Sequence, residues 1–171
     1  MTQSIEIIEY NIAWPTRFLA ERAILQIALA PWLIGDIEHI GSTSVLGLAA
    51  KPVIDIMAPV ASLEASRGAI SAVELMGYCF YSYKPEEMHW FCKPSPEVRT
   101  HHLHLVPLGS RTWVERLAFR DALRLNPAMA QEYAALERRL SQDFAYDREA
   151  YTDAKAPFIQ NVIRMQISYK T

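Results

Sequence analysis

The chain has 171 residues, a length that suits a single domain with a sizeable hydrophobic core, and we predict one domain over residues 1–171. Hydrophobic residues make up 51% of the sequence and charged residues 21%, which is typical of soluble globular proteins. The formal net charge of −2 lacks the basic excess of proteins that bind duplex nucleic acid or membrane surfaces, so we expect neither partner.

Three features of the sequence bear on the compartment in which the protein works. The N-terminal stretch MTQSIEIIEY contains acidic residues and no basic run, so we do not expect a signal peptide. The apolar run at 28–35 contains a proline and is too short for a membrane span. Cys79 and Cys92 lack the spacing of a metal-binding finger, and we expect free thiols in a reducing compartment. These features predict a cytoplasmic protein.

The first half of the chain combines helical and extended patterns. In chain order, we predict an extended arm (5–8), a helix (14–29), a strand (37–40), a strand (52–59) and a helix (62–76). Pro15 suits the first turn of the first helix, and Pro31 ends it. Ser62 is expected to cap the second helix and Gly77 to close it.

The second half begins with an antiparallel meander and continues with helices. We predict strands at 78–83, 88–92 and 98–106, then helices at 110–125, 128–144 and 148–167. Residues 93–96 are expected to form a turn, and Asn126 with Pro127 separates two of the helices. This order predicts an α+β domain, with a mixed sheet flanked by helices and a group of helices at its C-terminal end.

The turn between the first two strands is a candidate phosphate-binding segment. It combines one glycine with three small hydroxyl residues: Gly41, Ser42, Thr43 and Ser44. Backbone N–H groups and hydroxyls in such a turn can bind phosphate, although most serine-rich turns have no ligand. Asp55 follows in an otherwise apolar strand. Because an isolated buried carboxylate is costly, we expect Asp55 to be paired or functional.

Two histidines on the last predicted strand point to metal chemistry. Strand periodicity places His102 and His104 on the same face. Together with Asp55 they can bind a divalent ion such as magnesium, manganese or zinc, and imidazole ligands favour zinc, manganese or iron over magnesium. Asp55 and His104 are also the candidate catalytic residues. Two alternatives stay open: hydrogen-bonded sheet residues without a ligand, or a metal-free proton-transfer pair.

Several basic side chains are candidates for contacting an anionic ligand: Lys51, Arg116, Arg120, Arg124 and Lys155. Lys51 directly precedes the strand of Asp55, from which its ammonium can reach a phosphate at the Gly41 turn; the alternative is a solvated surface charge. The three arginines share one helix stripe, which would suit a polyanion if it faces a cleft and solvent if it does not. For His39, we expect a position in the core.

The run HIGSTSVLGLAAKPVIDI at 39–56 resembles the signature of the GrpB family, and the resemblance continues at 102–104, 119–124 and 151–158. The GrpB fold is similar to that of nucleotidyltransferases, which bind a metal ion and a triphosphate with a Gly-Ser turn and an Asp-x-Asp pair. The resemblance implies that Asp55 is the second aspartate of that pair, and Val53 stands in place of the first. It also implies a position for His104 where a third carboxylate usually lies.

Three functions follow from these observations. The resemblance implies a nucleotidyltransferase-like protein that acts on a nucleotide or another phosphorylated small molecule through the Gly41–Ser44 turn and Asp55. Because Val53 cannot ligate a metal and two-metal chemistry needs several carboxylates, binding without transfer is the first alternative. The second alternative is a metal-dependent enzyme of another class that uses Asp55, His102 and His104.

Overall fold

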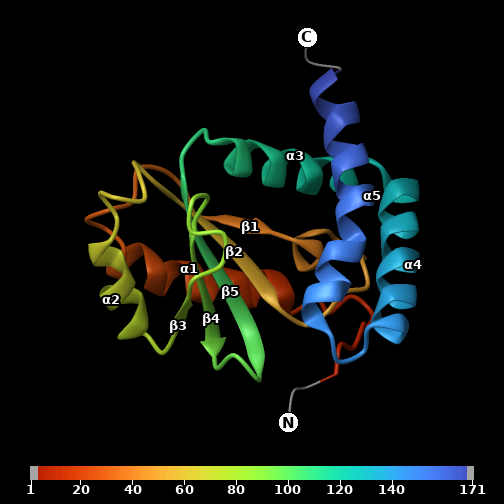
Figure 1. The fold of residues 1–171 in the computed structure, drawn as a ribbon, viewed down its shortest axis with the longest axis horizontal. Helices are drawn as coiled ribbons and strands as arrows, with labels where there is room; N and C mark the ends of the chain where they lie inside the picture. The colour runs from red at the N-terminus through yellow and green to blue at the C-terminus, as the bar shows by residue number, and fades with distance from the viewer. Residues whose placement is uncertain (1–3, 169–171) are drawn as a thin grey trace.

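The computed structural model describes residues 4–168, so both ends of the predicted domain extend beyond the described part. Its helices are α1 (Trp14–Ala28), α2 (Gly68–Glu74), α3 (Arg111–Leu125), α4 (Pro127–Asp143) and α5 (Arg148–Ser168). Its strands are β1 (Glu38–Ile40), β2 (Ile54–Val60), β3 (Cys79–Tyr81), β4 (His89–Pro94) and β5 (Arg99–Pro107), and a short 3-10 turn, η1 (Ser42–Ser44), follows β1. Figure 1 shows the sheet at the centre, with α3 and α5 on the opposite side from α1.

The strands form one mixed sheet of five strands in the order β1-β2-β5-β4-β3. The central strands β2 and β5 are parallel, and all other neighbours are antiparallel. The register places Asp55 opposite His102 and Met57 opposite His104. Because paired residues on neighbouring strands point to the same face, Asp55 and both histidines share one face of the sheet. The predicted α+β class and mixed sheet are confirmed.

The two faces of the sheet differ in what covers them. One face packs against α1 and α2 through an apolar core to which β2 and β5 contribute Ile54, Ile56, Leu103 and Leu105, all fully buried. The other face packs a smaller apolar cluster, including Met57 and Val106, against α3. Here α4 and α5 extend the layer, packing on α3 and on the segment after η1. Alternation along the central strands thus separates a core face from a face with polar residues.

The predicted boundaries hold for most elements, with three corrections. The predicted helix at 62–76 is shorter, because residues 63–67 form turns and α2 begins at Gly68. The hydroxyl of Ser62 accepts a hydrogen bond from the N–H of Ala65, so it caps this turn and not α2. The strand expected at 78–83 spans only Cys79–Tyr81.

The third correction concerns the turn that we predicted at 93–96. Lys93 and Pro94 instead continue β4, and a bulge in the ladder to β5 accommodates them. Side chains cap two of the C-terminal helices: the hydroxyl of Ser110 accepts a hydrogen bond from the N–H of Trp113 at the start of α3, and the side chain of Asn126 accepts one from the N–H of Met129 at the start of α4. Among the helices between residues 4 and 168, none combines the length and apolar character needed to cross a membrane.

Candidate functional site

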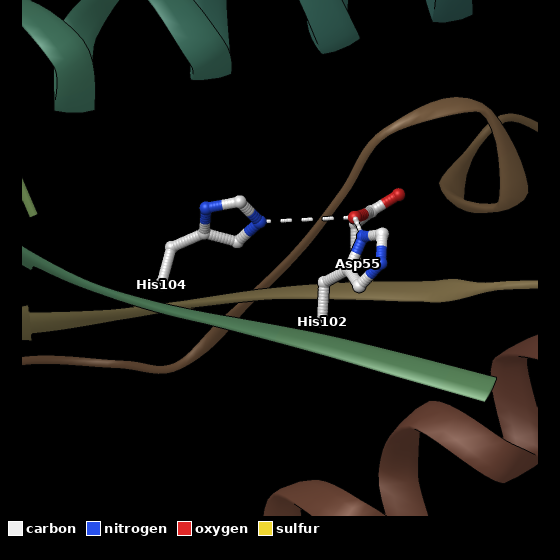
Figure 2. Close-up of side chains that lie close together, drawn as sticks. All are labelled: Asp55, His102 and His104. Atoms are coloured by element: carbon white, nitrogen blue, oxygen red, sulfur yellow. Dashed lines mark hydrogen bonds and ion pairs between the residues drawn. The ribbon is translucent and has the colours of Figure 1, made fainter. Parts of the chain in front are cut away.

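Asp55, His102 and His104 converge at the middle of the sheet (Figure 2). Nδ1 of His102 lies 2.9 Å from Oδ1 of Asp55, and Nε2 of His104 lies 3.7 Å from the same oxygen. The potential ligand atoms of the three side chains all lie within 4.8 Å of one another. This arrangement follows from the i, i+2 spacing on β5 and from the parallel register with β2. The cluster therefore has the ligand number and spacing of a metal site.

The imidazoles in this cluster, buried for His104 and largely buried for His102, are incompletely hydrogen-bonded. Side-chain exposure is 28% for Asp55, 14% for His102 and 5% for His104. Nδ1 of His104 contacts Sδ of Met88 at 3.3 Å, a weak partner. Nε2 of His102 and Nε2 of His104 are buried without a hydrogen-bond partner in residues 4–168. Buried polar atoms almost always have partners, so these nitrogens fit a site that accepts a metal ion or another polar ligand.

Electrostatics keep the cluster in the protonation state that a metal ion requires. Burial lowers the pKa of His104 to about 4, and the nearby charge of Arg116 acts in the same direction. Burial also lowers the pKa of His102, against the opposing effect of Asp55. For Asp55, burial alone would raise the pKa, but the hydrogen bond with His102 and the nearby imidazole of His104 hold it well below its usual range. Neutral imidazoles beside an ionised carboxylate are the forms that bind metals.

Gly41 brings the predicted phosphate turn directly against Asp55. Its φ of 70° lies in the left-handed region, which glycine adopts without strain. A Cβ at this position would lie 2.6 Å from Oδ2 of Asp55, closer than side-chain carbons approach other atoms. Only glycine therefore allows the turn to lie beside the carboxylate.

The hydroxyls of the turn already have partners within the protein. Ser42 donates to Glu137 at 3.1 Å, and Ser44 donates to the carbonyl of Gly41 at 2.6 Å. Thr43 donates to the carbonyl of Val53 and lies 3.0 Å from Nε2 of His39. An anion at this turn would therefore meet backbone N–H groups, and the expected contribution of free hydroxyls has no support in the geometry.

His39 lies in the core, as expected. It is 8% exposed and stacks on Phe18 with ring centroids 4.6 Å apart. Burial lowers its pKa to about 4, and the charges of Arg124 and Arg120 add to this effect while that of Asp55 opposes it. A neutral His39 therefore holds Thr43 in place beneath the turn.

Two lysines lie beside the cluster on the side of α5. Lys51 is half-buried, and its Nζ lies 4.9 Å from the centroid of the Tyr151 ring. Its ammonium has no carboxylate within ion-pair distance in the described part of the chain. Burial, together with the charge of Lys155, lowers the pKa of Lys51 to about 8. Lys155 is instead paired with the buried Glu137 at 3.3 Å. Lys51 is therefore partly buried beside Tyr151 and is not a fully exposed surface charge.

The arginine stripe of α3 divides between two roles. Arg120 forms ion pairs with Glu38 at 2.6 Å and with Asp121 at 2.8 Å. Arg124 donates twice to the carbonyl of Ser44. These contacts tie α3 to β1 and to the turn, and neither arginine lines the cleft described below. Arg120 and Arg124 are therefore not part of the ligand site that the geometry supports.

Arg116 is the member of the stripe that reaches the site. Its guanidinium lies 4.0 Å from Sδ of Met88 and has no carboxylate partner between residues 4 and 168. Its charge lowers the pKa of His104, and the charge of Lys51 lowers that of His102. The four-residue spacing between Arg116 and Arg120 predicts that they share one helix face. The spacing does not predict which of them forms ion pairs with acidic residues.

An open cleft of about 1660 Å³ joins these groups. Among the predicted site residues, its walls include Gly41, Ser42, Thr43, Lys51, Asp55, His102, His104 and Lys155, but not Ser44. Arg116 of the predicted arginine stripe also lines it, together with four residues of chemical interest that were not predicted: Trp90, Arg99, Tyr133 and Glu137. Most of them come from elements distant in sequence, so only the fold brings them together.

The sequence of the chain matches a known protein family. The model of the GrpB protein family matches residues 4–165. A UPF0157 protein of Pseudomonas aeruginosa is 36% identical over 163 residues, which cover 93% of this chain and 66% of that protein. UPF0157 protein YqkA of Bacillus subtilis is 33% identical, and the match covers 92% of this chain and 46% of that protein. The chain therefore spans less than two thirds of both relatives.

A solved structure extends the similarity to three dimensions. The crystal structure of conserved protein GrpB from Enterococcus faecalis matches with a TM-score of 0.86 at 32% identity, over 96% of this chain and 99% of that one. The glutamate-rich protein GrpB of Alkalihalophilus pseudofirmus is 28% identical, and the match covers 92% of each chain. None of these names states an activity. From the family match and the shared fold, we conclude that the chain belongs to the GrpB family.

Proposed function

We propose that this protein binds one divalent transition-metal ion through Asp55, His102 and His104 and, beside it, the phosphate group of a nucleotide or another phosphorylated small molecule. The observation that carries the proposal is the convergence of these three side chains in a cleft, with two buried imidazole nitrogens lacking partners. Two imidazoles and one carboxylate suit zinc, manganese or iron(II) better than magnesium, which prefers oxygen ligands.

The charges around the cluster support an anionic ligand. Lys51 and Arg116 both lack a carboxylate partner among the described residues, and they act on the cluster from the sides of His102 and His104. Unpaired cations next to a cleft are costly unless a ligand or solvent compensates them. A bound metal ion would add further positive charge, so a phosphate would restore the balance.

The chemistry available here favours binding or single-metal catalysis. When bound, the ion would neutralise charge on a phosphate oxygen. Asp55 holds the imidazole of His102 in position through its hydrogen bond, and Gly41 keeps the approach to the carboxylate open. Val53 lines the same cleft without offering a ligand. Its lack of a carboxylate supports the second candidate function, a binder without transferase activity.

Metal titration by calorimetry tests the proposal. Native protein should bind one Mn²⁺ or Zn²⁺ per chain, and Asp55→Asn, His102→Gln and His104→Gln should each weaken binding by about 100-fold, as the loss of metal-site groups commonly does. The matched control is His101→Gln, since His101 lies on the other face of β5 and contacts Thr100. Equal binding by all five proteins, or none by the native protein, would refute the metal site. Turnover of nucleotides by the metal-loaded native protein would separate enzyme from binder.

A further inference from the structure

The end of the cleft beyond the histidines is lined by aromatic side chains. Trp90 from β4 and Tyr81 from β3 lie in one row with His104 across three strands, and Tyr83 lies two residues after the end of β3. All three aromatic residues line the same cleft as the Asp55 cluster. Tyr81 is 54% exposed and Tyr83 36% exposed, whereas Trp90 is buried. Exposed rings that gather in a cleft are a common feature of ligand sites.

Ring geometry leaves the two tyrosines available for a ligand. Tyr81 and Tyr83 contact Trp90 at centroid distances of 6.2 and 6.1 Å and at steep angles of 86° and 65°, so they do not stack on it. The guanidinium of Arg99 lies 5.2 Å from the Trp90 centroid and adds a second planar group. The Trp90 ring in turn lies 5.0 Å from the ring of His102. The buried indole of Trp90 therefore lies between the Asp55 cluster and the aromatic end of the cleft.

The two sides of the cluster thus differ in chemistry. On the side of Tyr151 lie the ammonium groups of Lys51 and Lys155, which suit anionic groups. On the side of Trp90 lie Tyr81 and Tyr83, which suit a planar apolar ring. A ligand that fills both sides carries a ring at one end and a phosphate at the other.

We propose that the Tyr81–Tyr83 end of the cleft stacks the base of a nucleotide whose phosphate lies at the Asp55 cluster. This inference rests on the proposed function and narrows its ligand from any phosphorylated small molecule to a nucleotide. Tyrosine and arginine planes stack on bases, and such stacking is sequence-tolerant because every base has a π-face. All four common bases should therefore bind with similar affinity.

Calorimetry on the Mn²⁺-loaded protein tests the base subsite with ligands that share a sugar and a phosphate. AMP, GMP, CMP and UMP should each bind about tenfold or more tightly than ribose 5-phosphate, the range expected for one stacked base. The double variant Tyr81→Ala/Tyr83→Ala should lose most of this difference while its affinity for ribose 5-phosphate is unchanged. The double variant with phenylalanine at both positions should keep the difference. The matched control is Phe80→Ala, which removes a 37% exposed ring that lies outside the cleft on the same strand.

The outcomes separate this inference from the proposal on which it rests. If ribose 5-phosphate and the nucleotides bind equally to native protein, phosphate binding stands and the base subsite is refuted. If the alanine variant weakens ribose 5-phosphate as much as AMP, the tyrosines contact the sugar, which also refutes base stacking. If no phosphorylated compound binds, the phosphate site fails and the base subsite fails with it.

Discussion

The two faces of the same pair of strands have opposite properties. On the α1 side, Ile54, Ile56, Leu103 and Leu105 are fully buried in a closed apolar core. On the α3 side, Asp55, His102 and His104 alternate with them and open onto a cleft. Neighbours in sequence therefore belong to different parts of the molecule. The face toward α1 therefore contributes most to stability, and the face toward α3 is available for ligand binding. Substitutions on the first face should lower the free energy of unfolding, and substitutions on the second should lower ligand affinity.

The largest effect is expected on the free energy of unfolding, from the replacement of Leu103, a core residue next to His102 in the sequence. Leu103→Ala should lower the free energy of unfolding by about 2–5 kcal/mol, because it removes buried methyl groups and leaves a cavity. His102→Gln, one position away and on the other face, should cost about 1 kcal/mol or less. Urea unfolding of the metal-free proteins measures both values. Equal losses for the two variants would contradict the separation of the faces.

The next effect concerns the dependence of stability on pH. The pKa of His39 is about 4 in the folded protein, below the ordinary value of 6.5, so the unfolded state binds more protons between these values. Stability should therefore fall as the pH drops through this window, with a contribution from His39 of about 2 kcal/mol between pH 7 and pH 5.

His39→Gln should remove that contribution, and urea unfolding at several pH values measures it. His102 and His104 have lowered pKa values too, so part of the acid sensitivity should remain in the variant. Curves for native and variant protein that stay parallel from pH 7 to pH 5 would show that His39 is not held neutral by burial.

The smallest effect is expected on ligand affinity, from the replacement of Lys51 in the wall of the cleft. Its pKa of about 8 means that it is mostly charged at pH 7 and loses its charge above pH 8. Binding of AMP to native protein should therefore weaken between pH 7 and pH 9, and Lys51→Met should weaken it about tenfold at pH 7, the range of a charge-assisted hydrogen bond.

The affinity of the Lys51→Met protein should also change less with pH. Calorimetry at pH 7 and pH 9 provides both comparisons. Arg111→Gln is the control, because Arg111 is an exposed cation that does not line the cleft and already has Glu115 as an ion-pair partner. An identical pH dependence in native and Lys51→Met protein would remove Lys51 from the ligand site.

The sequence was most informative where local periodicity decides the structure. Alternation on one strand places His102 and His104 on a common face, and that required no knowledge of the fold. The α+β order of elements followed from patterns of the same kind. The approach of Asp55 to both histidines also depended on the parallel pairing of β2 with β5, which no local pattern specifies.

The sequence was least informative about charged side chains. Arg116 and Arg120 have the same spacing on α3, yet Arg120 finds Glu38 of β1 and Arg116 finds no carboxylate in residues 4–168. Arg120 and Glu38 are 82 positions apart in the sequence, so their ion pair forms only because the fold brings them together. The aromatic end of the cleft was missed for the same reason, since its rings meet only after β3, β4 and β5 have paired.

A crystal structure of the protein with Mn²⁺ and AMP, with anomalous diffraction data, tests the central claim most directly. We expect one anomalous peak within coordination distance of Asp55, His102 and His104, with the AMP phosphate beside it and the base at Tyr81 and Tyr83. A metal-loaded crystal with no peak between these three side chains, or with the ion bound elsewhere in the cleft, would contradict the account.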